Sequence, residues 1–196
     1  MAATIRPAVL VIDPRPGWAG EFAALGTLLR SVLGDLATRI DHVGSTSVPG
    51  LPAKDVIDVQ VSVATEEGLD AATDALGAAG YQRWPYDRDH TVPGLPADDG
   101  QWRKRGLGER PGERRANIHV RVEGRANQRY ALLFRDYLRA HPASAEAYGR
   151  YKRLSAAALA DPADYPDVKD PVCDLIYLPA EEWARRTGWR PGPSDA

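Results

Sequence analysis

The sequence predicts an α/β (α+β) fold in which helices pack on one mixed β-sheet. In the first half of the chain, short segments with the two-residue period of strands alternate with segments that have the helical period. After residue 125 the helical period dominates. The chain has 196 residues and 43% hydrophobic content, so we expect one core and a single domain over residues 1–189. The tail at residues 190–196 is expected to be disordered.

The first half of the chain is expected to supply four strands and two helices. Proline favours the first turn of a helix and glycine favours its end, which sets the bounds of the first helix. In order, the expected elements are a strand at 9–12, a helix from Pro16 to Gly34, strands at 39–43 and 56–63, a helix at 66–79 and a strand beginning at 81–84.

Residues 85–115 have no consistent period and are rich in glycine and proline. Long irregular segments inside compact domains are usually functional or disordered, so we expect a flexible segment or wide hairpin that covers a substrate. Residues 102–104 are a candidate strand beside the site. A strand at 116–123 follows, and then helices at about 126–140, 143–159 and 166–186, separated by proline-containing breaks.

Charge and cysteine content limit the class of protein. The chain has 25 Lys and Arg against 27 Asp and Glu, so its net charge of -2 provides no field that would attract a free polynucleotide. Cys173 has no partner for an internal disulfide and is expected to be a packed core residue. We expect neither a signal peptide nor a membrane span, and therefore a cytoplasmic location.

Residues 42–63, HVGSTSVPGLPAKDVIDVQVSV, combine a strand end, a turn of small residues and a second strand. Small residues and hydroxyls let a turn approach a polyphosphate closely, although such hydroxyls also serve local turn structure. In the second strand, alternation places Asp58 and Gln60 on the more polar face. A carboxylate in that position can hold a metal ion against a phosphate, so the segment predicts a phosphate site.

These residues resemble a known family. The string GSTSVPGLPAK followed by IDVQV is similar to the GrpB-like (UPF0157) proteins, a branch of the nucleotidyltransferase superfamily that is also found fused to dephospho-coenzyme A kinase. The resemblance continues through WRKRG, NIHV and LLFRDYLRAHP to Tyr151-Lys152 and Lys169, and so spans nearly the whole chain. It implies a nucleotidyltransferase-like mixed sheet with helices packed on it and a helical C-terminal part.

The sequence departs from the superfamily pattern at the expected metal ligands. Active members carry Asp-x-Asp or Asp-x-Glu on the strand after the turn and a third carboxylate on a neighbouring strand. Here Gln60 takes the second position, and His119 takes the third by its match to the family. Magnesium prefers carboxylate and water oxygens, so these residues make a poor two-metal cage. A single Mg²⁺ or Mn²⁺, carried by the nucleotide and held by Asp58, is the expected cofactor.

The resemblance also implies roles for other side chains. Asp58 and His119 are the candidate catalytic residues, with His119 a general base or a hydrogen-bonding contact. The alternative for each candidate cation is ordinary solvated charge, and Lys152 and Lys169 are favoured because a triphosphate needs balancing charge. The candidate nucleotide-binding residues are Gly44, Ser45, Ser47, Lys54, Gln60, Arg103, Lys104, Arg121, Lys152 and Lys169.

The predicted function is that of a nucleotidyltransferase-like protein. It would bind a nucleoside triphosphate with Mg²⁺ and transfer a nucleotidyl or related group to a small acceptor. One alternative is a catalytically reduced module that binds a nucleotide or other phosphorylated metabolite, which Gln60 favours. Another is a fold reused for ligase or acyl-transfer chemistry. All readings predict that Asp58, Gln60 and His119 share one concave face of the sheet.

Overall fold

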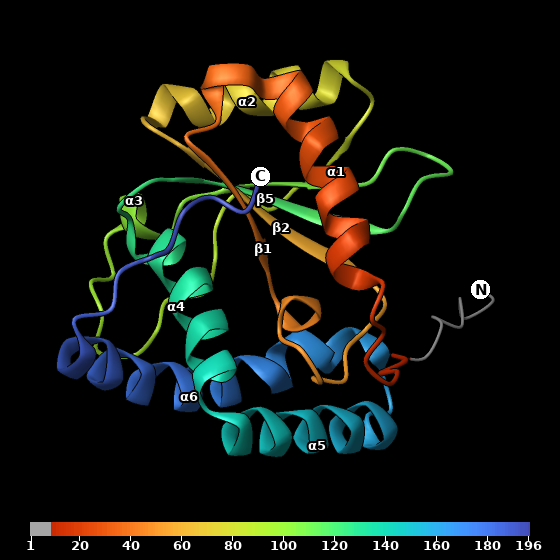
Figure 1. Ribbon diagram of the computed structural model, residues 1–196, viewed down its shortest axis with the longest axis vertical. Helices are drawn as coiled ribbons and strands as arrows, with labels where there is room; N and C mark the ends of the chain where they lie inside the picture. The colour runs from red at the N-terminus through yellow and green to blue at the C-terminus, as the bar shows by residue number, and fades with distance from the viewer. Residues whose placement is uncertain (1–8) are drawn as a thin grey trace.

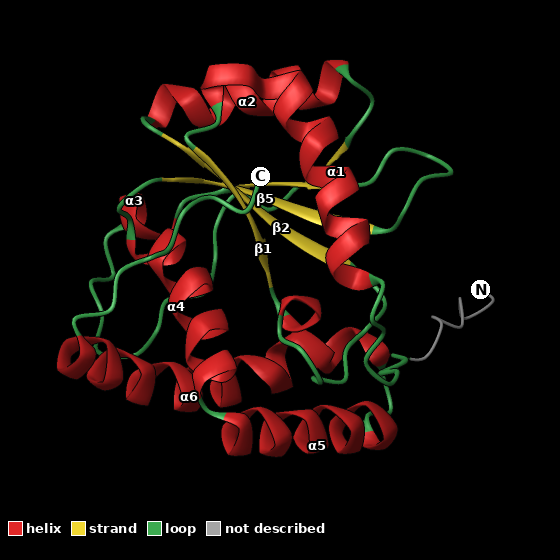
Figure 2. Cartoon of the chain, viewed as in Figure 1, coloured by secondary structure: helices red, strands yellow, loops and turns green. Residues whose placement is uncertain are grey.

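The computed structural model describes residues 9–196 and has one mixed β-sheet between two groups of helices (Figures 1 and 2). The α-helices are α1 (Trp18–Leu33), α2 (Glu66–Ala78), α3 (Asp99–Trp102), α4 (Ala126–Ala140), α5 (Pro142–Ala158) and α6 (Tyr165–Thr187). The strands are β1 (Arg39–Val43), β2 (Ile57–Val63), β3 (Gln82–Arg83), β4 (Arg105–Gly108) and β5 (Ala116–Val122). Short 3₁₀ helices are η1 (Gly34–Leu36), η2 (Ser45–Ser47) and η3 (Pro162–Asp164).

The sheet has five strands in the order β1-β2-β5-β4-β3. The central strands β2 and β5 are parallel, while β1 pairs antiparallel with β2, and β4 pairs antiparallel with β5 and β3. Helices α1 and α2 lie against one face, and α4 and α6 lie on the other side of the sheet with α5 outside them (Figure 1). This confirms the predicted mixed sheet with helices packed on it.

Alternation along the two central strands divides the sheet into an apolar face and a polar face. Val59 and Val61 of β2 and Ile118 and Val120 of β5 are fully buried in the core beneath α1 and α2. Burial of each such side chain contributes roughly 1.5–3 kcal/mol, so this face holds the fold together. The intervening residues of both strands face the C-terminal helices, and the functional side chains come from that face.

Two expected strands are wrong. Within residues 9–12 only Ile12 forms a bridge, to Ala53, because the chain there pairs with a loop rather than with the sheet. Residues 102–104 do not form a strand either: Trp102 ends α3, and β4 begins only at Arg105. Residues 1–8 of the expected single domain lie outside the part that the structure describes.

The C-terminal tail also differs from the expected disorder. Residues 190–196 form no regular element, but they run along β1, where the Ala196 amide donates to the Ile40 carbonyl at 3.0 Å. The Asp195 carboxylate accepts from the His42 amide at 2.9 Å and from Arg135 at 2.8 Å. Because β1 is an edge strand, it presents unpaired backbone groups that a following segment can satisfy. No helix among residues 9–196 has the length and apolarity needed to cross a membrane.

Candidate functional site

The polar face of the sheet and helices α4, α5 and α6 enclose a cleft that we call the Asp58 cleft. It comprises a cavity of about 480 Å³ and a narrow one of about 60 Å³. Ser45, Asp58, Asn117 and Lys169 line both cavities, so the two meet at Asp58. The narrow cavity is completed by Thr46, Ala53, Lys54, Val56, Lys152 and Tyr165, while Trp84, Lys104, His119, Arg121, Tyr130, Phe134 and Tyr148 are among the residues around the larger one.

The turn after β1 brings Gly44 against Asp58 and places Ser45 in the same two cavities as this carboxylate. Gly44 has a φ of 68°, and a Cβ there would lie 2.3 Å from Oδ2 of Asp58, so this close approach requires glycine. Ser47 donates its hydroxyl to the Gly44 carbonyl at 2.6 Å and lines neither cavity. Ser47 therefore has the local turn role, whereas Ser45 faces the cleft.

Asp58 is oriented by a neighbouring amide. Asn117, its partner on β5, donates through Nδ2 to Oδ1 of Asp58 at 2.7 Å. Burial raises the pKa of the Asp58 carboxyl, while the Asn117 hydrogen bond and the positive charges of Lys169 and Lys54 oppose that rise. The second carboxylate oxygen is not engaged by this bond, which makes Asp58 suited to a ligand or a cation.

Three lysines from different parts of the chain converge on the narrow cavity. Lys54 lies in the loop before β2, with Nζ 5.0 Å from the centre of the Tyr165 ring, and Lys169 lies on α6. Lys152, on α5, donates to Ser45 Oγ at 2.8 Å and also to the Pro52 carbonyl. This arrangement brings together three of the predicted cations.

The surroundings of the three lysines shift the pKa values of their amines in different directions. Burial, with the neighbouring charge of Lys169, lowers the pKa of Lys152 to about 7. Burial also lowers the pKa of Lys54. In Lys169, burial acts in the same direction, but Cys173, Asp58 and other acidic groups outweigh it and raise the pKa. Lys169 is thus the firmly charged lysine, and Lys152 is poised between charged and neutral.

Gln60 differs from its expected role. The register pairs Gln60 with His119 and Asp58 with Asn117, so the three candidates share the polar face as predicted. Gln60, however, is fully buried and lines neither cavity. Its Oε1 accepts from Arg121 at 2.8 Å and its Nε2 donates to the Gln128 carbonyl at 3.1 Å. The expected contact between Gln60 and a nucleotide is therefore wrong, because Arg121 and the Gln128 carbonyl already occupy both ends of its side-chain amide.

His119 borders the larger cavity, where the Trp84 ring meets it edge-on with 5.6 Å between ring centres. Its Nδ1 is buried without a hydrogen-bond partner among the described residues. Burial, reinforced by Arg121 and Lys104, lowers the pKa of His119 well below its usual value. The imidazole is therefore neutral where it borders the cavity, and it is a weak general base.

The remaining predicted cations have protein partners. Arg103 lines neither cavity and pairs instead with Glu66 of α2 at 2.7 Å, away from its expected nucleotide contact. Lys104 and Arg121 border the larger cavity, but both pair with Asp89, at 2.6 Å and 2.8 Å. Although burial alone would raise it, these two positive charges hold the pKa of Asp89 far below its usual range.

Several residues of the cleft were not predicted from the sequence. Asn117 could have been found, because it lies two residues before His119 on the same strand face. Asp89 and Trp84 lie in or next to the aperiodic segment, where no periodicity predicts the direction of a side chain. Tyr130 and Phe134 belong to a helix whose orientation depends on tertiary packing. No local sequence signal identifies these four.

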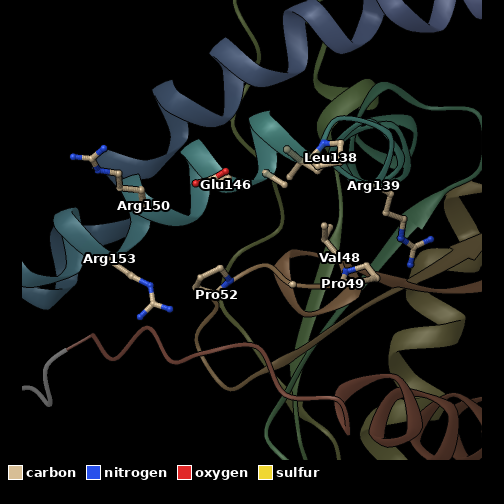
Figure 3. Close-up of a pocket in the computed structure, with 11 residues that line it drawn as sticks. Val48, Pro49, Pro52, Leu138, Arg139, Glu146, Arg150 and Arg153 are labelled. Atoms are coloured by element: carbon tan, nitrogen blue, oxygen red, sulfur yellow. The ribbon is translucent and has the colours of Figure 1, made fainter.

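A second hollow, of about 710 Å³, lies between residues 48–52 and helices α4 and α5 (Figure 3). Its wall is largely apolar, with Val48, Pro52 and Leu138 among its residues, and Arg150 and Arg153 extend from α5 beside it. The Asp58 cleft instead has a carboxylate, an amide and several cations directed at one point. We therefore assign the candidate site to the Asp58 cleft.

The donors of this cleft do not fit a two-metal site. Within residues 9–196, no group of three or more His, Cys, Asp or Glu side chains is arranged to hold a metal ion. Asp58 has neutral Asn117 and positive Lys169 as neighbours, whereas a two-metal site needs several carboxylates. One cation with Asp58 as its protein carboxylate is compatible with the residues present.

Comparison with known proteins identifies the family. The family model described as "GrpB protein" matches residues 8–178, so the chain belongs to the GrpB family. A dephospho-CoA kinase of Mycolicibacterium paratuberculosis is 36% identical over 200 residues, covering 95% of this chain and 49% of the relative. The chain thus spans about half the length of that curated relative.

Solved structures confirm the fold. The crystal structure of GrpB from Enterococcus faecalis covers 89% of this chain and 99% of its own, with a TM-score of 0.69 and 29% identity. Cid1 in complex with its short product ApU covers 74% of this chain and 42% of its own, with a TM-score of 0.50 and 15% identity. At that identity the likeness concerns the fold alone, which is nucleotidyltransferase-like.

Proposed function

We propose that this protein binds a nucleoside triphosphate in the Asp58 cleft and transfers its nucleotidyl or a related group to a small acceptor. The observation that carries the proposal is the convergence of Lys54, Lys169 and Ser45 on Asp58, in a narrow cavity that adjoins a larger, aromatic one. A cationic pocket next to an aromatic pocket matches the two ends of a nucleotide.

The narrow cavity is suited to the phosphates. Lys169 stays positively charged, and its charge together with that of Lys54 would neutralise phosphate oxygens. Ser45 offers a hydroxyl, and Gly44 allows the backbone to come close. Asp58 would hold the single Mg²⁺ or Mn²⁺ that accompanies the nucleotide, and that ion would neutralise charge between phosphates.

The larger cavity is suited to the base and sugar. Trp84, Tyr130 and Phe134 supply aromatic surface there, and a base can stack on such rings. Its volume of about 480 Å³ lies within the range of small-molecule sites. The neutral ring of His119 borders this cavity and would contact the ligand. A cytoplasmic location, where nucleoside triphosphates are available, is part of this proposal.

A binding module without turnover is the second candidate, and one observation favours it. Gln60, at the position where active members of the superfamily carry a carboxylate, is locked between Arg121 and Gln128. The mycobacterial relative is named a dephospho-CoA kinase, which adds phosphorylated metabolites related to coenzyme A as ligands to test. The two candidates share the cleft and differ in whether a covalent bond is broken.

The test compares binding with turnover. Calorimetric titration of each triphosphate with Mg²⁺ should reveal binding that Lys169→Gln weakens by about 10- to 100-fold, the usual effect of losing one hydrogen bond to a charged group. Arg103→Gln, the same change outside the cleft, should leave affinity unchanged. Pyrophosphate release in the presence of a metabolite pool would support transfer, and binding without release would support the module. Absence of binding for every ligand would contradict both.

A further inference from the structure

We propose that Ser45 and Lys152 form a nucleophile and general base pair, and that the nucleotidyl group passes through a covalent ester on Ser45. This inference rests on the proposed function and adds a reaction intermediate to it. Its basis is the contact between Ser45 Oγ and Lys152 Nζ at 2.8 Å, at the edge of the cavity that would hold the phosphates.

Ser45 is distinguished from the other hydroxyls of its turn. Thr46 Oγ1 contacts the His42 ring at 3.0 Å and donates to the Val56 carbonyl at 3.3 Å. Ser47 donates to the Gly44 carbonyl at 2.6 Å. Ser45 alone of the three has an amine as its side-chain partner, and it borders both cavities. Its oxygen can therefore reach a ligand while its proton faces a base.

The surroundings of Lys152 make it a base rather than the nucleophile. Its amine lies between Ser45, the Pro52 carbonyl and the face of the Tyr148 ring, 4.7 Å from the ring centre. A neutral amine has two N–H groups and one lone pair. The carbonyl can only accept, so the lone pair is free for the Ser45 hydroxyl. The Pro52 carbonyl and the Tyr148 ring hold the amine beside Ser45, which positions its lone pair toward the hydroxyl.

The surroundings of Lys152 lower the pKa of its amine: burial and the charges of Lys169 and Arg153 act in this direction, and Cys173 and Asp58 oppose it. Lys169 and Cys173 face it from α6, Asp58 from β2, and Arg153 lies beside it on α5. Burial and Lys169 bring the pKa of its amine to about 7, so a substantial fraction is neutral at physiological pH. A base with a pKa near the working pH is best placed to accept and return a proton.

The proposed transfer has two steps. Ser45 Oγ forms a bond to the α-phosphorus as the bond to the bridging oxygen breaks, pyrophosphate leaves, and the hydroxyl proton passes to Lys152 Nζ. In the second step an acceptor hydroxyl forms a bond to the same phosphorus and the Ser45 ester bond breaks. Lys152 returns its proton to Ser45 Oγ, and the proton of the acceptor is released to water. Each step exchanges one P–O bond for another and needs no oxidant or reductant.

The experiment uses the full chain with each nucleoside triphosphate and Mg²⁺, without acceptor, followed by acid quench and intact-mass and peptide analysis. We expect a mass increase of one nucleoside monophosphate unit on the peptide that contains Ser45. Ser45→Ala should abolish it. Ser31→Ala, a serine on the exposed side of α1, should leave it unchanged. A label on Lys152 instead of Ser45 would overturn the proposal.

Lys152→Arg separates charge from proton transfer, because a guanidinium stays protonated. We expect nucleotide affinity within about threefold of wild type and a rate of adduct formation at least 100-fold lower, the lower range for loss of a general base. Should this variant not fold, the wild-type rate still decides: it should rise tenfold per pH unit below about 7 and then level off. A rate independent of pH would overturn the proposal.

Calorimetric titration of nucleotide into the same samples distinguishes failure of the serine ester from failure of the proposed function. Nucleotide binding without any adduct in the wild-type protein would overturn the serine ester and leave the proposed function standing. Absence of nucleotide binding would overturn both.

Discussion

Two carboxylates on the polar side of the sheet have opposite surroundings. Asp89 is buried against Arg121, Lys104 and Asn127, and its negative charge is satisfied within the protein. Asp58 has one hydrogen bond, from Asn117, and shares its cavity with lysines for which no ion pair is found in the described part of the chain. A satisfied network stabilises a fold, and an unsatisfied cluster of charges is suited to a ligand.

The largest effect is expected from breaking the satisfied network. Asp89→Asn removes the charge that compensates Arg121 and Lys104, which leaves two cations buried. Breaking such a pair costs about 3–5 kcal/mol, and urea unfolding should detect this loss. Asp74→Asn, which removes a carboxylate paired with exposed Arg83, should cost less than about 1 kcal/mol. Equal losses of unfolding free energy in the two variants would contradict the view that the buried Asp89 network stabilises the fold more than an exposed ion pair does.

Asp58→Asn should have the converse effect. The fold already disfavours the charged form, because burial raises the pKa of Asp58. We therefore expect the free energy of unfolding to change by less than about 1 kcal/mol. Nucleotide affinity measured with Mg²⁺ should fall to the affinity measured without it, since Asp58 is the proposed protein ligand. A large loss of stability with unchanged binding would make Asp58 structural.

The two carboxylates should also differ in their response to acid. Because the folded pKa of Asp89 lies below its unfolded value of about 3.9, its contribution to stability is complete above that value. It is lost as pH falls further toward the folded pKa. Between pH 5 and pH 2.5, wild type should thus lose more unfolding free energy than Asp89→Asn does. Parallel curves for the two proteins would show that Asp89 is not held ionised.

Strand periodicity and turn chemistry predicted part of this comparison. Alternation placed Asp58 and His119 on the polar sides of their strands, and the elements from β1 to α2 were predicted nearly to the residue, whereas the register that pairs Asp58 with Asn117 was not predicted. The glycine of the turn has a physical requirement that the structure confirms, namely the space taken by Asp58. Strand alternation and turn geometry depend on residues that are close in the chain, so they can be predicted from the sequence.

The partners of Asp89, of Arg103 and of the C-terminal tail could not be predicted from the sequence. Asp89 comes from an aperiodic segment, and only tertiary packing brings it to Arg121. The same packing directs Arg103 to Glu66 rather than to the cleft. The tail follows β1 because that edge strand is unpaired, a condition set by strand order rather than by the composition of the tail. Each failure concerns a long-range partner that no local pattern encodes.

The smallest effect on ligand binding is expected at Gln60, which lies on β2 two residues from Asp58 and contacts Arg121, the partner of Asp89. In a weakened two-metal site, Gln60→Glu would add a metal ligand two residues from Asp58 and tighten Mg²⁺ binding. The side chain of Gln60 instead contacts Arg121 and the Gln128 carbonyl and lines neither cavity. The new carboxylate would therefore pair with Arg121 and compete with Asp89 for it. It would also face the Gln128 carbonyl, to which a carboxylate cannot donate, and this costs about 1–3 kcal/mol of stability. Calorimetric titration should give Mg²⁺ and nucleotide affinities within about twofold of wild type, and a clear gain in Mg²⁺ affinity would return Gln60 to the site.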